Sequence, residues 1–563
     1  MCRALIGSNI LKTSPLLLSV SLRPAPCPSP ILTLGGLTSR RHKSLTTMAA
    51  SDKLVPTYDN ALHLLSLLQS NKNIINLFTA DPASQGDINA SAIPEMTAWL
   101  SRAGYSPADL ARLRCIHVAG TKGKGSTCAF TSSILRQYPE VAGRVGTYTS
   151  PHLVTVRERI CLDGEPISQE KFTAYFFEVW NRLSDAARKA GDKLPDGDEL
   201  GADGPSTKPF YFRFLTLLAL HAFLKEGVKS AVIECGIGGE YDSTNVLPAE
   251  AVTASAVTQL GIDHVAMLGD TVEKIAWHKA GIFKKGVPAY SQQSGRSDGD
   301  GVSKVLSERA HERGTTLDSI DSQVLEKWAG VQNAQLEGAF QKANMALAAV
   351  TSRRHLQALG HKFELPFFES GGSPLPSKLG DMPEQFITGL QAASLRGRCE
   401  TITHDRIQWY LDGAHTEDSL VQVGRWYAGK ISGQDSIRVL IFNQQDRDSA
   451  ALLQTLLETI LGETEIPNQK IFHHAFCPTN EANSFMKKPE FTVQRKNCDV
   501  IRQFCPFTAA IPADSISTAL DMARNVMLGS KKSKDNFKVQ VLVTGSFNLV
   551  GPALKLLEPG GEP

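Results

Sequence analysis

A short apolar run that ends in a glycine-rich turn most constrains the fold of this 563-residue chain. The run Cys115–Ala119 leads into Gly-Thr-Lys-Gly-Lys-Gly-Ser-Thr at 120–127, and residues 128–135 continue as an apolar helical pattern. This order is typical of a buried strand, a phosphate-binding turn and a helix whose N-terminal amides face an anion. Lys124 adds a full positive charge. The segment therefore predicts an open parallel sheet with a phosphate site.

The loop does not follow the strict P-loop pattern G-x-x-x-x-G-K-[ST]. Val118 stands where that pattern has its first glycine, and Gly125 separates Lys124 from Ser126. The alternative interpretation is a glycine turn without a ligand. The order of strand, Gly-Lys-Gly-Ser and helix favours the phosphate site.

Alternation of short apolar runs with helical patterns extends through the chain. The helical pattern Tyr211–Lys225 precedes apolar runs at 231–234 and Val252–Val257, and polar stretches at 186–208, 291–301 and 371–383 are expected to be surface loops. Further apolar runs lie at 407–411, 437–442, 470–475 and 539–543. The predicted fold class is α/β: a P-loop-type, mostly parallel sheet with helices on both faces at 55–394, and a smaller C-terminal α/β domain at 395–563.

Two further segments place polar side chains directly after apolar runs. Glu234 opens Glu-Cys-Gly-Ile-Gly-Gly-Glu-Tyr-Asp-Ser-Thr-Asn at 234–245, and Gly-Ile-Asp-His follows at 261–264. Ligands bind at the carboxyl ends of the strands in open parallel sheets. A carboxylate there, beside a nucleotide phosphate, is a suitable Mg²⁺ ligand. Taken alone, the glycine loop could be only a tight turn and His264 only a surface histidine.

Charge and cysteine content exclude several classes of protein. Lys and Arg number 59 against 57 Asp and Glu, so there is no basic excess for nucleic acid. No run of 18 or more apolar residues predicts a membrane span. The ten cysteines form no CxxC pair, which indicates reduced thiols.

The N-terminal segment has a composition of its own. Six basic residues and no acidic ones precede Asp52. Residues 1–50 are therefore expected to be a transit peptide for the mitochondrial matrix, and a second start at Met48 would supply a cytoplasmic form. The alternative is an extension without a targeting role.

Two signatures carry a family resemblance. Residues 116–127 resemble the first signature of the folylpolyglutamate synthases, in which GT[NK]GKGS follows a strand, and residues 232–247 resemble the second, ExGxGGxxDxTN. Lys122 and the segment Tyr-Thr-Ser-Pro-His at 148–152 resemble the eukaryotic branch. This family belongs to the Mur-ligase superfamily of ATP-dependent amide-bond-forming enzymes. The resemblance extends over 58–290 and 338–555.

Carried over position by position, the resemblance implies roles for named residues. ATP would be bound by the loop and by three residues further along the chain, of which Asn344 lies near adenine, Arg398 reaches a phosphate and Asp412 bonds the ribose; the loop residues are Gly120, Thr121, Lys122, Gly123, Lys124, Gly125 and Ser126. Mg²⁺ would be held by Ser150, Glu234 and His264. Lys279, in Ala-Trp-His-Lys-Ala-Gly-Ile, would be carbamylated and would help hold a second metal site, with K⁺ or another monovalent cation as a further candidate cofactor. Lys124, Lys279 and His415 would be the catalytic residues, with His415 near the incoming amino acid. Arg396 replaces the proline that the family has before Gly-Arg, and Ala339 replaces a more usual polar residue.

The resemblance implies ATP-dependent addition of glutamate to the γ-carboxyl of a folate glutamate through an acyl phosphate. The partners expected are folate, L-glutamate and ATP, without nucleic acid or integral membrane association, for a monomeric protein. One alternative is dihydrofolate synthase, which joins glutamate to dihydropteroate with the same machinery. Another is a non-catalytic nucleotide-binding protein on the same scaffold. The aromatic cluster at 210–214 is expected to be helix core rather than a pterin-stacking surface, and 543–548 is expected to be structural.

Overall fold

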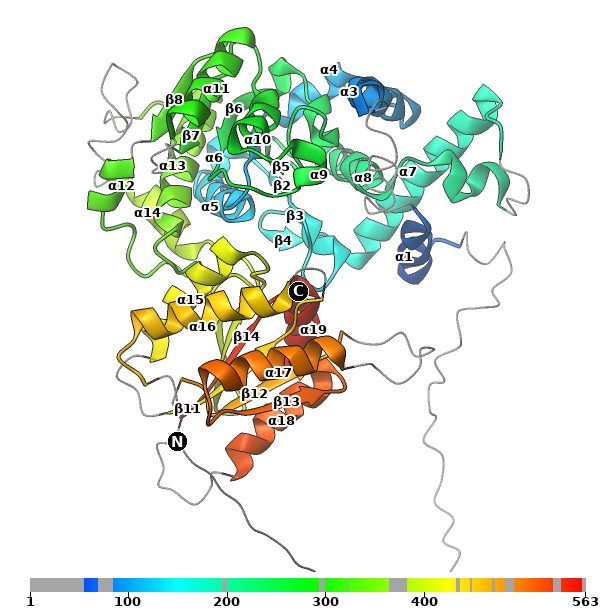
Figure 1. The fold of residues 1–563 in the computed structure, drawn as a ribbon. Coiled ribbons are helices and arrows are strands. Elements are labelled where there is room, and N and C mark those ends of the chain that lie inside the picture. Colours follow the sequence, from blue (N-terminus) through cyan, green and yellow to red (C-terminus); the bar gives the residue numbers. More distant parts are fainter. Residues whose placement is uncertain are drawn as a thin grey trace, which may run out of the picture. The chain divides into compact units, whose positions relative to one another are not determined.

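The computed structural model describes residues 55–68, 85–194, 200–292, 299–320, 322–363, 382–431, 436–445, 448–467, 471–480, 491–529 and 538–558. The expected transit peptide at 1–50 and Met48 lie outside these residues. No helix in the described ranges is long and apolar enough to cross a bilayer. Figure 1 shows two sheets, each covered by helices.

The first sheet has the strand order β4-β3-β2-β5-β1-β6-β7-β8 in the described part of the chain. Strands β2, β5, β1, β6, β7 and β8 pair in parallel with their neighbours. At one edge, β3 pairs antiparallel with β2, and β4 pairs antiparallel with β3. The strands are β1 Cys115–Ala119, β2 Val145–Tyr148, β3 Ile160–Leu162, β4 Glu165–Pro166, β5 Ser230–Glu234, β6 Val252–Val257, β7 Ala289–Gln292 and β8 Leu317–Ile320. The central position of β1 places the predicted phosphate loop at the middle of the sheet.

Helices cover both faces of this sheet, because successive strand residues point to opposite sides. Cys115 packs with α1, α3, α7 and α8, whereas Ile116 and Val118 pack with α5, α13 and α14. The longer helices are α1 Tyr58–Leu67, α3 Gln85–Arg102, α5 Lys124–Arg136, α7 Gln169–Ala190, α8 Tyr211–Lys225, α10 Val272–Lys279, α11 Gly299–Glu312, α13 Gln341–Ala358 and α14 Glu384–Ala392. Shorter helices are α4 Pro107–Leu110, α6 Pro139–Ala142, α9 Val265–Leu268 and α12 Ser322–Lys327.

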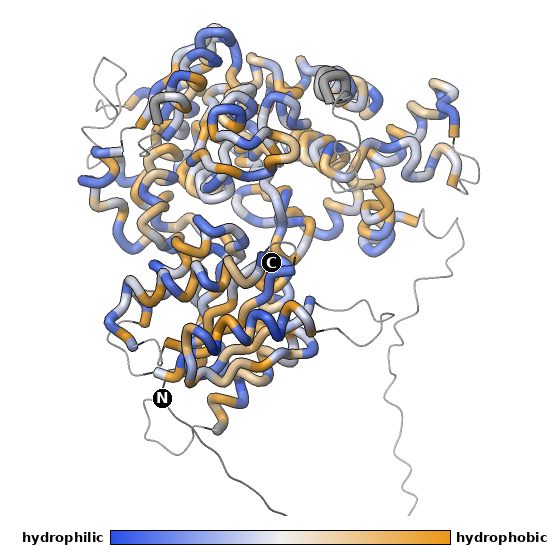
Figure 2. Tube along the Cα trace, in the orientation of Figure 1, coloured by the Kyte–Doolittle hydropathy of each residue, from blue (hydrophilic) through white to orange (hydrophobic). Residues whose placement is uncertain are grey.

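The second sheet has the order β13-β12-β11-β14-β10-β9, with β9 antiparallel and the others parallel. Its strands are β9 Glu400–His404, β10 Ile407–Asp412, β11 Ser436–Phe442, β12 His474–Pro478, β13 Ala509–Ala513 and β14 Lys538–Thr544. One face packs on α15 Glu417–Ile431, α16 Ser449–Glu463 and α17 Thr492–Phe504, and the other on α18 Ile516–Gly529 and α19 Phe547–Leu557. Hydrophobic and hydrophilic residues alternate along α16 and α17 in Figure 2, as expected for helices with one face on a sheet. The predicted α/β class with a second, smaller α/β domain is confirmed.

Several expected boundaries differ from the structure. Helix α7 continues to Ala190, into the stretch expected to be a loop, and Lys208 at the end of that stretch is buried with its Nζ 4.7 Å from the ring centroid of Trp180. Strand β12 begins at His474, because the apolar residues before it are buried outside the sheet.

Candidate active site

The turn after β1 is fixed by the segment that follows β6. The amides of Thr121 and Lys122 both donate to the carbonyl of Gln259, at 2.9 and 3.1 Å, and the hydroxyl of Thr258 donates to the carbonyl of Lys122 at 2.6 Å. Helix α5 then begins at Lys124, and its first turn leaves backbone amides without partners within the helix. The amides free for an anion are therefore those at the helix N-terminus and not those of Thr121 and Lys122.

Two glycines in this turn are required by space and by backbone geometry. Gly120 has φ +149° and Gly123 has φ +87°. A Cβ on Gly120 would lie 1.8 Å from Oγ1 of Thr258, and a Cβ on Gly123 would lie 2.2 Å from Oδ1 of Asn344. Because glycine has no Cβ, the backbone can approach both neighbours closely. The turn is thereby pressed against β6 on one side and α13 on the other.

Two lysines meet at the start of the turn. Nζ of Lys279, at the end of α10, donates to the carbonyl of Gly120 at 2.7 Å, and Nζ of Lys124 donates to the same oxygen at 3.1 Å. Lys279 is buried, and burial, assisted by the positive charge of Lys124, lowers its pKa to about 7. Lys279 is therefore held in part as a neutral amine near neutral pH.

Glu234 ends β5 beside β1 and is 3 % exposed. Its Oε2 accepts a hydrogen bond from the amide of Ser150 at 3.1 Å, and burial raises the pKa of its carboxyl although Lys124 opposes that shift. The peptide bond between Ser150 and Pro151 is cis. The structure thus brings Ser150 and Glu234, two of the three predicted metal ligands, into direct contact.

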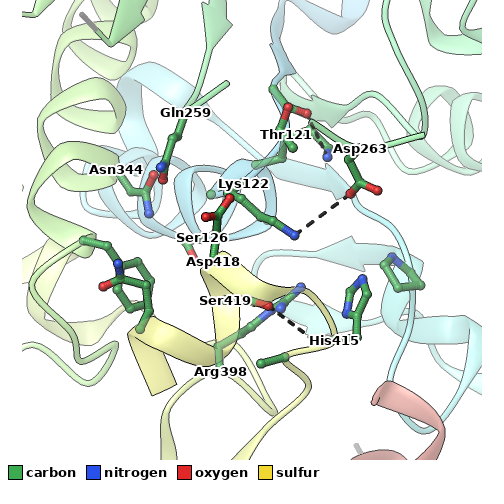
Figure 3. A pocket seen from close by; sticks show the side chains of 18 of the residues that line it. Thr121, Lys122, Ser126, Gln259, Asp263, Asn344, Arg398, His415, Asp418 and Ser419 are labelled. Atoms are coloured by element: carbon green, nitrogen blue, oxygen red, sulfur yellow. Dashed lines mark hydrogen bonds and ion pairs between the residues drawn. The ribbon is translucent and has the colours of Figure 1, made fainter. Parts of the chain in front are cut away.

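The third predicted ligand, His264, lies at the cavity edge. It has φ +51° and is the N-cap of α9, and its amide donates to Oδ1 of Asp263 at 2.9 Å. Oδ2 of Asp263 lies 4.0 Å from Nζ of Lys122 and 4.0 Å from Nε2 of His264. Figure 3 shows Lys122 and Asp263 facing each other across this part of the wall. Asp263 therefore draws the loop lysine toward the His264 turn.

The loop after Glu234 is held by one buried carboxylate. Oδ2 of Asp242 accepts from the amides of Gly236 and Ile237, at 2.9 and 3.0 Å, while Oδ1 accepts from the amide and hydroxyl of Thr244. The Thr244 hydroxyl also lies 2.9 Å from Nε2 of His117 on β1. These bonds explain locally why the second signature needs an aspartate and a threonine at this spacing.

Asn344, on α13, is predicted to lie near adenine. Its Nδ2 donates to Gln341 at 2.8 Å, and its Oδ1 accepts from Gln292 at 3.3 Å. The side chain is 3 % exposed but lines the cavity. Its polar atoms are therefore engaged with the protein, and its role toward a nucleotide stays a prediction.

The second domain contributes a turn held by another buried carboxylate. Asp412, at the end of β10, accepts from the amides of Cys399 and Ala414, each at 2.8 Å. Burial raises the pKa of Asp412, and Arg398 opposes that shift. Arg396, where the family has proline, pairs with Glu400 at 2.7 Å. An ion pair therefore stabilises the turn that carries Arg398.

His415 and Arg398 both lie against Phe547, the first residue of α19. The guanidinium carbon of Arg398 is 4.5 Å from the ring centroid of Phe547, and the His415 ring is 5.6 Å from the same centroid. Nδ1 of His415 lies 3.0 Å from the carbonyl of Gly413, and its amide donates to the Ser419 hydroxyl. Segment 543–548, expected to be structural, therefore also contributes an aromatic ring to the site.

One cavity of about 670 Å³ lies between these loops and turns. Its walls include every residue predicted for catalysis, ATP binding or metal binding: Gly120, Thr121, Lys122, Gly123, Lys124, Gly125, Ser126, Ser150, Glu234, His264, Lys279, Asn344, Arg398, Asp412 and His415. Figure 3 shows Arg398 and His415 on the side opposite Lys122 and Asp263. A space of this size is suited to a small-molecule ligand.

The cavity is also lined by Arg159, which the sequence did not single out, and by Phe212, expected to be helix core. Arg159 lines it and donates from Nε to Nδ1 of His152 at 2.8 Å, and the ring of Phe212 closes another part of the wall. Phe214 is fully buried in the core, so the aromatic cluster at 210–214 is divided between core and cavity. The one sequence signal that could have pointed to Arg159 is its position shortly after the 148–152 motif.

A glycine turn with two lysines lies on a parallel sheet and faces an arginine and a histidine from a second α/β domain. This arrangement defines a two-domain α/β protein with a site suited to nucleotide phosphates. No family model matches the sequence. The chain is 44 % identical over 411 residues to a folylpolyglutamate synthase of Saccharomyces cerevisiae, covering 72 % of this chain and 70 % of that protein. The chain belongs to the folylpolyglutamate synthase family.

Solved structures agree on the fold. Folylpolyglutamate synthase of Mycobacterium tuberculosis complexed with ADP superposes with a TM-score of 0.64 at 20 % identity, covering 92 % of this chain and all of that one. A structure described as an FPGS–AMPPCP–folate complex gives a TM-score of 0.61 at 22 % identity, covering 89 % of this chain and 99 % of that one.

Proposed function

We propose that this protein adds glutamate to the γ-carboxyl of a folate glutamate tail in an ATP-dependent reaction. Membership of the folylpolyglutamate synthase family supports the activity, and the neighbours bound to ADP or to AMPPCP and folate support the substrates. The observation that carries the proposal is the single cavity in which the phosphate loop meets Arg398 and His415 of the second domain.

The chemistry needs carboxylate activation, because a carboxylate and an amine do not condense unaided in water. An oxygen of the γ-carboxylate attacks the γ-phosphorus of ATP, which forms an acyl phosphate and releases ADP. The amine of a second glutamate then attacks the acyl carbon, forming the amide and releasing phosphate and a proton. Lys124 of the phosphate loop and Arg398 of the second domain both line the cavity and would offset negative charge on the transferred group.

Mg²⁺ fits the donor set at the strand ends. Glu234 is a buried carboxylate in contact with Ser150, and carboxylate and hydroxyl oxygens suit a hard cation. Within the described residues, no cluster of three His, Cys, Asp or Glu side chains is close enough to hold a metal. Ser150, Glu234 and His264 would therefore hold Mg²⁺ together with water and ATP phosphate oxygens. When bound, the ion would supply charge stabilisation of the phosphates.

Lys279 suits carbamylation by its environment. CO₂ reacts with a neutral amine, forming R–NH–COO⁻ and releasing a proton, and the lowered pKa of Lys279, about 7, keeps a substantial share of this amine neutral. The carbamate would convert a cation into an anion with two oxygen donors, suited to Mg²⁺ or to K⁺ or another monovalent cation.

The decisive experiment supplies the purified protein with ATP, Mg²⁺ and labelled glutamate, and offers tetrahydrofolate or dihydropteroate in separate reactions. We expect label in tetrahydrofolate products that lengthen with time. Labelling of dihydropteroate alone would indicate dihydrofolate synthase. ATP binding without labelling of either acceptor would indicate a non-catalytic nucleotide-binding protein.

Residues 1–50 direct part of the product to the mitochondrial matrix, and initiation at Met48 leaves a cytoplasmic form. The support is the basic, acid-free composition before Asp52. The proposed assembly state is a monomer, since the cavity draws on both domains of one chain. Size-exclusion chromatography with light scattering tests that state.

A further inference from the structure

A partly buried ion-pair cluster lies behind the wall that carries Lys279. The guanidinium of Arg309, on α11, is bonded to Oε2 of Glu240, in the loop after β5. Its central carbon lies 4.4 Å from the ring centroid of Trp277, on α10. Arg313, one residue past the end of α11, donates to Oε1 of the same carboxylate at 2.5 Å. Arg309 is 7 % exposed and joins three separate segments.

Glu240 is in turn joined to the end of α10 by its backbone. Its amide donates to the carbonyl of His278 at 2.7 Å, and Nδ2 of Asn245 donates to the carbonyls of both Glu240 and Gly281, at 3.0 and 3.1 Å. A Cβ on Gly281 would lie 2.4 Å from Cα of Glu240. Glu240 is therefore packed directly against the residues on either side of Lys279.

We infer that Arg309 is a positioning residue for Lys279 in the proposed ligation. Its guanidinium contacts Trp277, which lies two residues before Lys279. It also bonds to Glu240, whose amide donates to the carbonyl of His278. Nζ of Lys279 reaches Gly120 at 2.7 Å, so a shift of this segment moves that nitrogen relative to the phosphate loop. Misplacement by about 1 Å can cost on the order of a hundredfold in rate.

The guanidinium is chemically suited to this double contact. A planar fork can bond a carboxylate while its face packs on an aromatic ring, and a lysine ammonium cannot do both in the same way. Removing one partner of a buried pair leaves an uncompensated charge. Here Arg313 remains on Glu240, so the carboxylate keeps one cation when Arg309 is changed.

The test compares Arg309→Met and Arg309→Lys with the wild-type chain, and uses Lys304→Met as the matched control. Lys304 lies on the same helix in an exposed pair with Glu308 at 3.9 Å, away from Glu240. The measurements are the kcat of glutamate ligation, the KM for ATP and the thermal unfolding midpoint. The concentration of folded protein used for kcat is taken from nucleotide binding. We expect Arg309→Met to lose about tenfold or more in kcat with KM for ATP nearly unchanged, Arg309→Lys to be intermediate, and Lys304→Met to match wild type.

The inference rests on the proposed function, and the wild-type reaction separates the two. Absence of ligation by the wild-type chain would contradict the proposed function itself. Wild-type ligation together with a wild-type kcat for folded Arg309→Met would overturn the positioning role, even if that variant melts earlier. Should Arg309→Met lack a cooperative unfolding transition, a wild-type kcat for Arg309→Lys would overturn it equally.

Discussion

Lys124 and Lys279 both donate a hydrogen bond to the carbonyl oxygen of Gly120. Lys124 begins α5, and Lys279 ends α10. Two ammonium groups at one oxygen repel each other, and the more deeply buried of the two, Lys279, has its pKa lowered to about 7. Lys279 is therefore expected to be available in part as a neutral amine.

Lys124→Ala should abolish ligation while the protein stays folded. The change removes one charge from the phosphate loop, which costs on the order of a hundredfold or more in rate in a closed site. Steady-state ligation with circular dichroism checks it, and Lys285→Ala, which alters an exposed lysine, is the control. Near-normal turnover by Lys124→Ala would contradict the assignment of the loop.

Lys279→Ala should lose activity, and a small carboxylic acid added to the reaction should restore part of it. The added acid would supply the carboxylate that the proposed carbamate would otherwise provide. Lys279→Arg keeps a positive charge but forms no equivalent carbamate, so it should be as inactive as the alanine variant. An active arginine variant would show that positive charge is sufficient.

The stability cost of burying Lys279 should depend on pH. Its pKa is about 7 in the folded chain against an ordinary value of 10.5, so between these values the unfolded chain holds a proton that the folded chain lacks. The free-energy cost of burying the charged Lys279 therefore falls as pH rises from about 7 to 10.5, and it is fully present below pH 7. In urea unfolding in CO₂-free buffer, Lys279→Met should have a higher free energy of unfolding than wild type at pH 7. This difference should be smaller at pH 9. An equal gain at both values would refute the burial effect.

Glu234→Gln should weaken Mg²⁺ binding through loss of the buried carboxylate charge, while Glu234→Asp keeps the charge and should retain more of the Mg²⁺ affinity. We expect the Mg²⁺ concentration for half-maximal ligation to rise about tenfold or more for the amide variant, the cost of about one lost charged contact. Titration of ligation against free Mg²⁺, with Mn²⁺ binding measured directly, checks both variants. An unchanged Mg²⁺ requirement in Glu234→Gln would remove this residue from the metal site.

Residues 1–50 fused to a fluorescent reporter should direct it to mitochondria, since a basic, acid-free leader is typical of transit peptides. A matched fusion that begins at Met48 should remain in the cytosol. Imaging with a mitochondrial dye distinguishes them, and a uniformly cytosolic signal from the first fusion would defeat the proposal.

Most of the central strands could be predicted because each is a short, largely apolar run. Strand β1 and helix α8 begin and end where the sequence pattern places them. Strand β9 was missed because its residues are alternately half-buried and exposed, and it pairs antiparallel at the sheet edge. Its position depends on pairing with β10, which no local apolar pattern records.

The residues of the candidate site also fall into those with a local sequence signal and those that only the folded chain brings to the cavity. Residues in glycine-rich signatures, such as Lys124 and Glu234, could be found because the turn itself demands a special sequence. Arg159 and Gln341 reach the cavity from segments outside these signatures, so only the folded chain brings them there. Phe547 comes from the 543–548 segment, expected to be structural. Arg309 is further removed, since it acts through Glu240 and Trp277 without lining the cavity.

The ring of Phe547 lies under both Arg398 and His415, and it belongs to the last helix of the described chain. The second domain therefore cannot complete its side of the cavity until its final strand and helix are in place. During synthesis, a nascent chain that has already folded the glycine turn of the first domain would still lack the platform for its arginine and histidine. Competence for ligation thus requires that β14 and α19 have been synthesised and have folded.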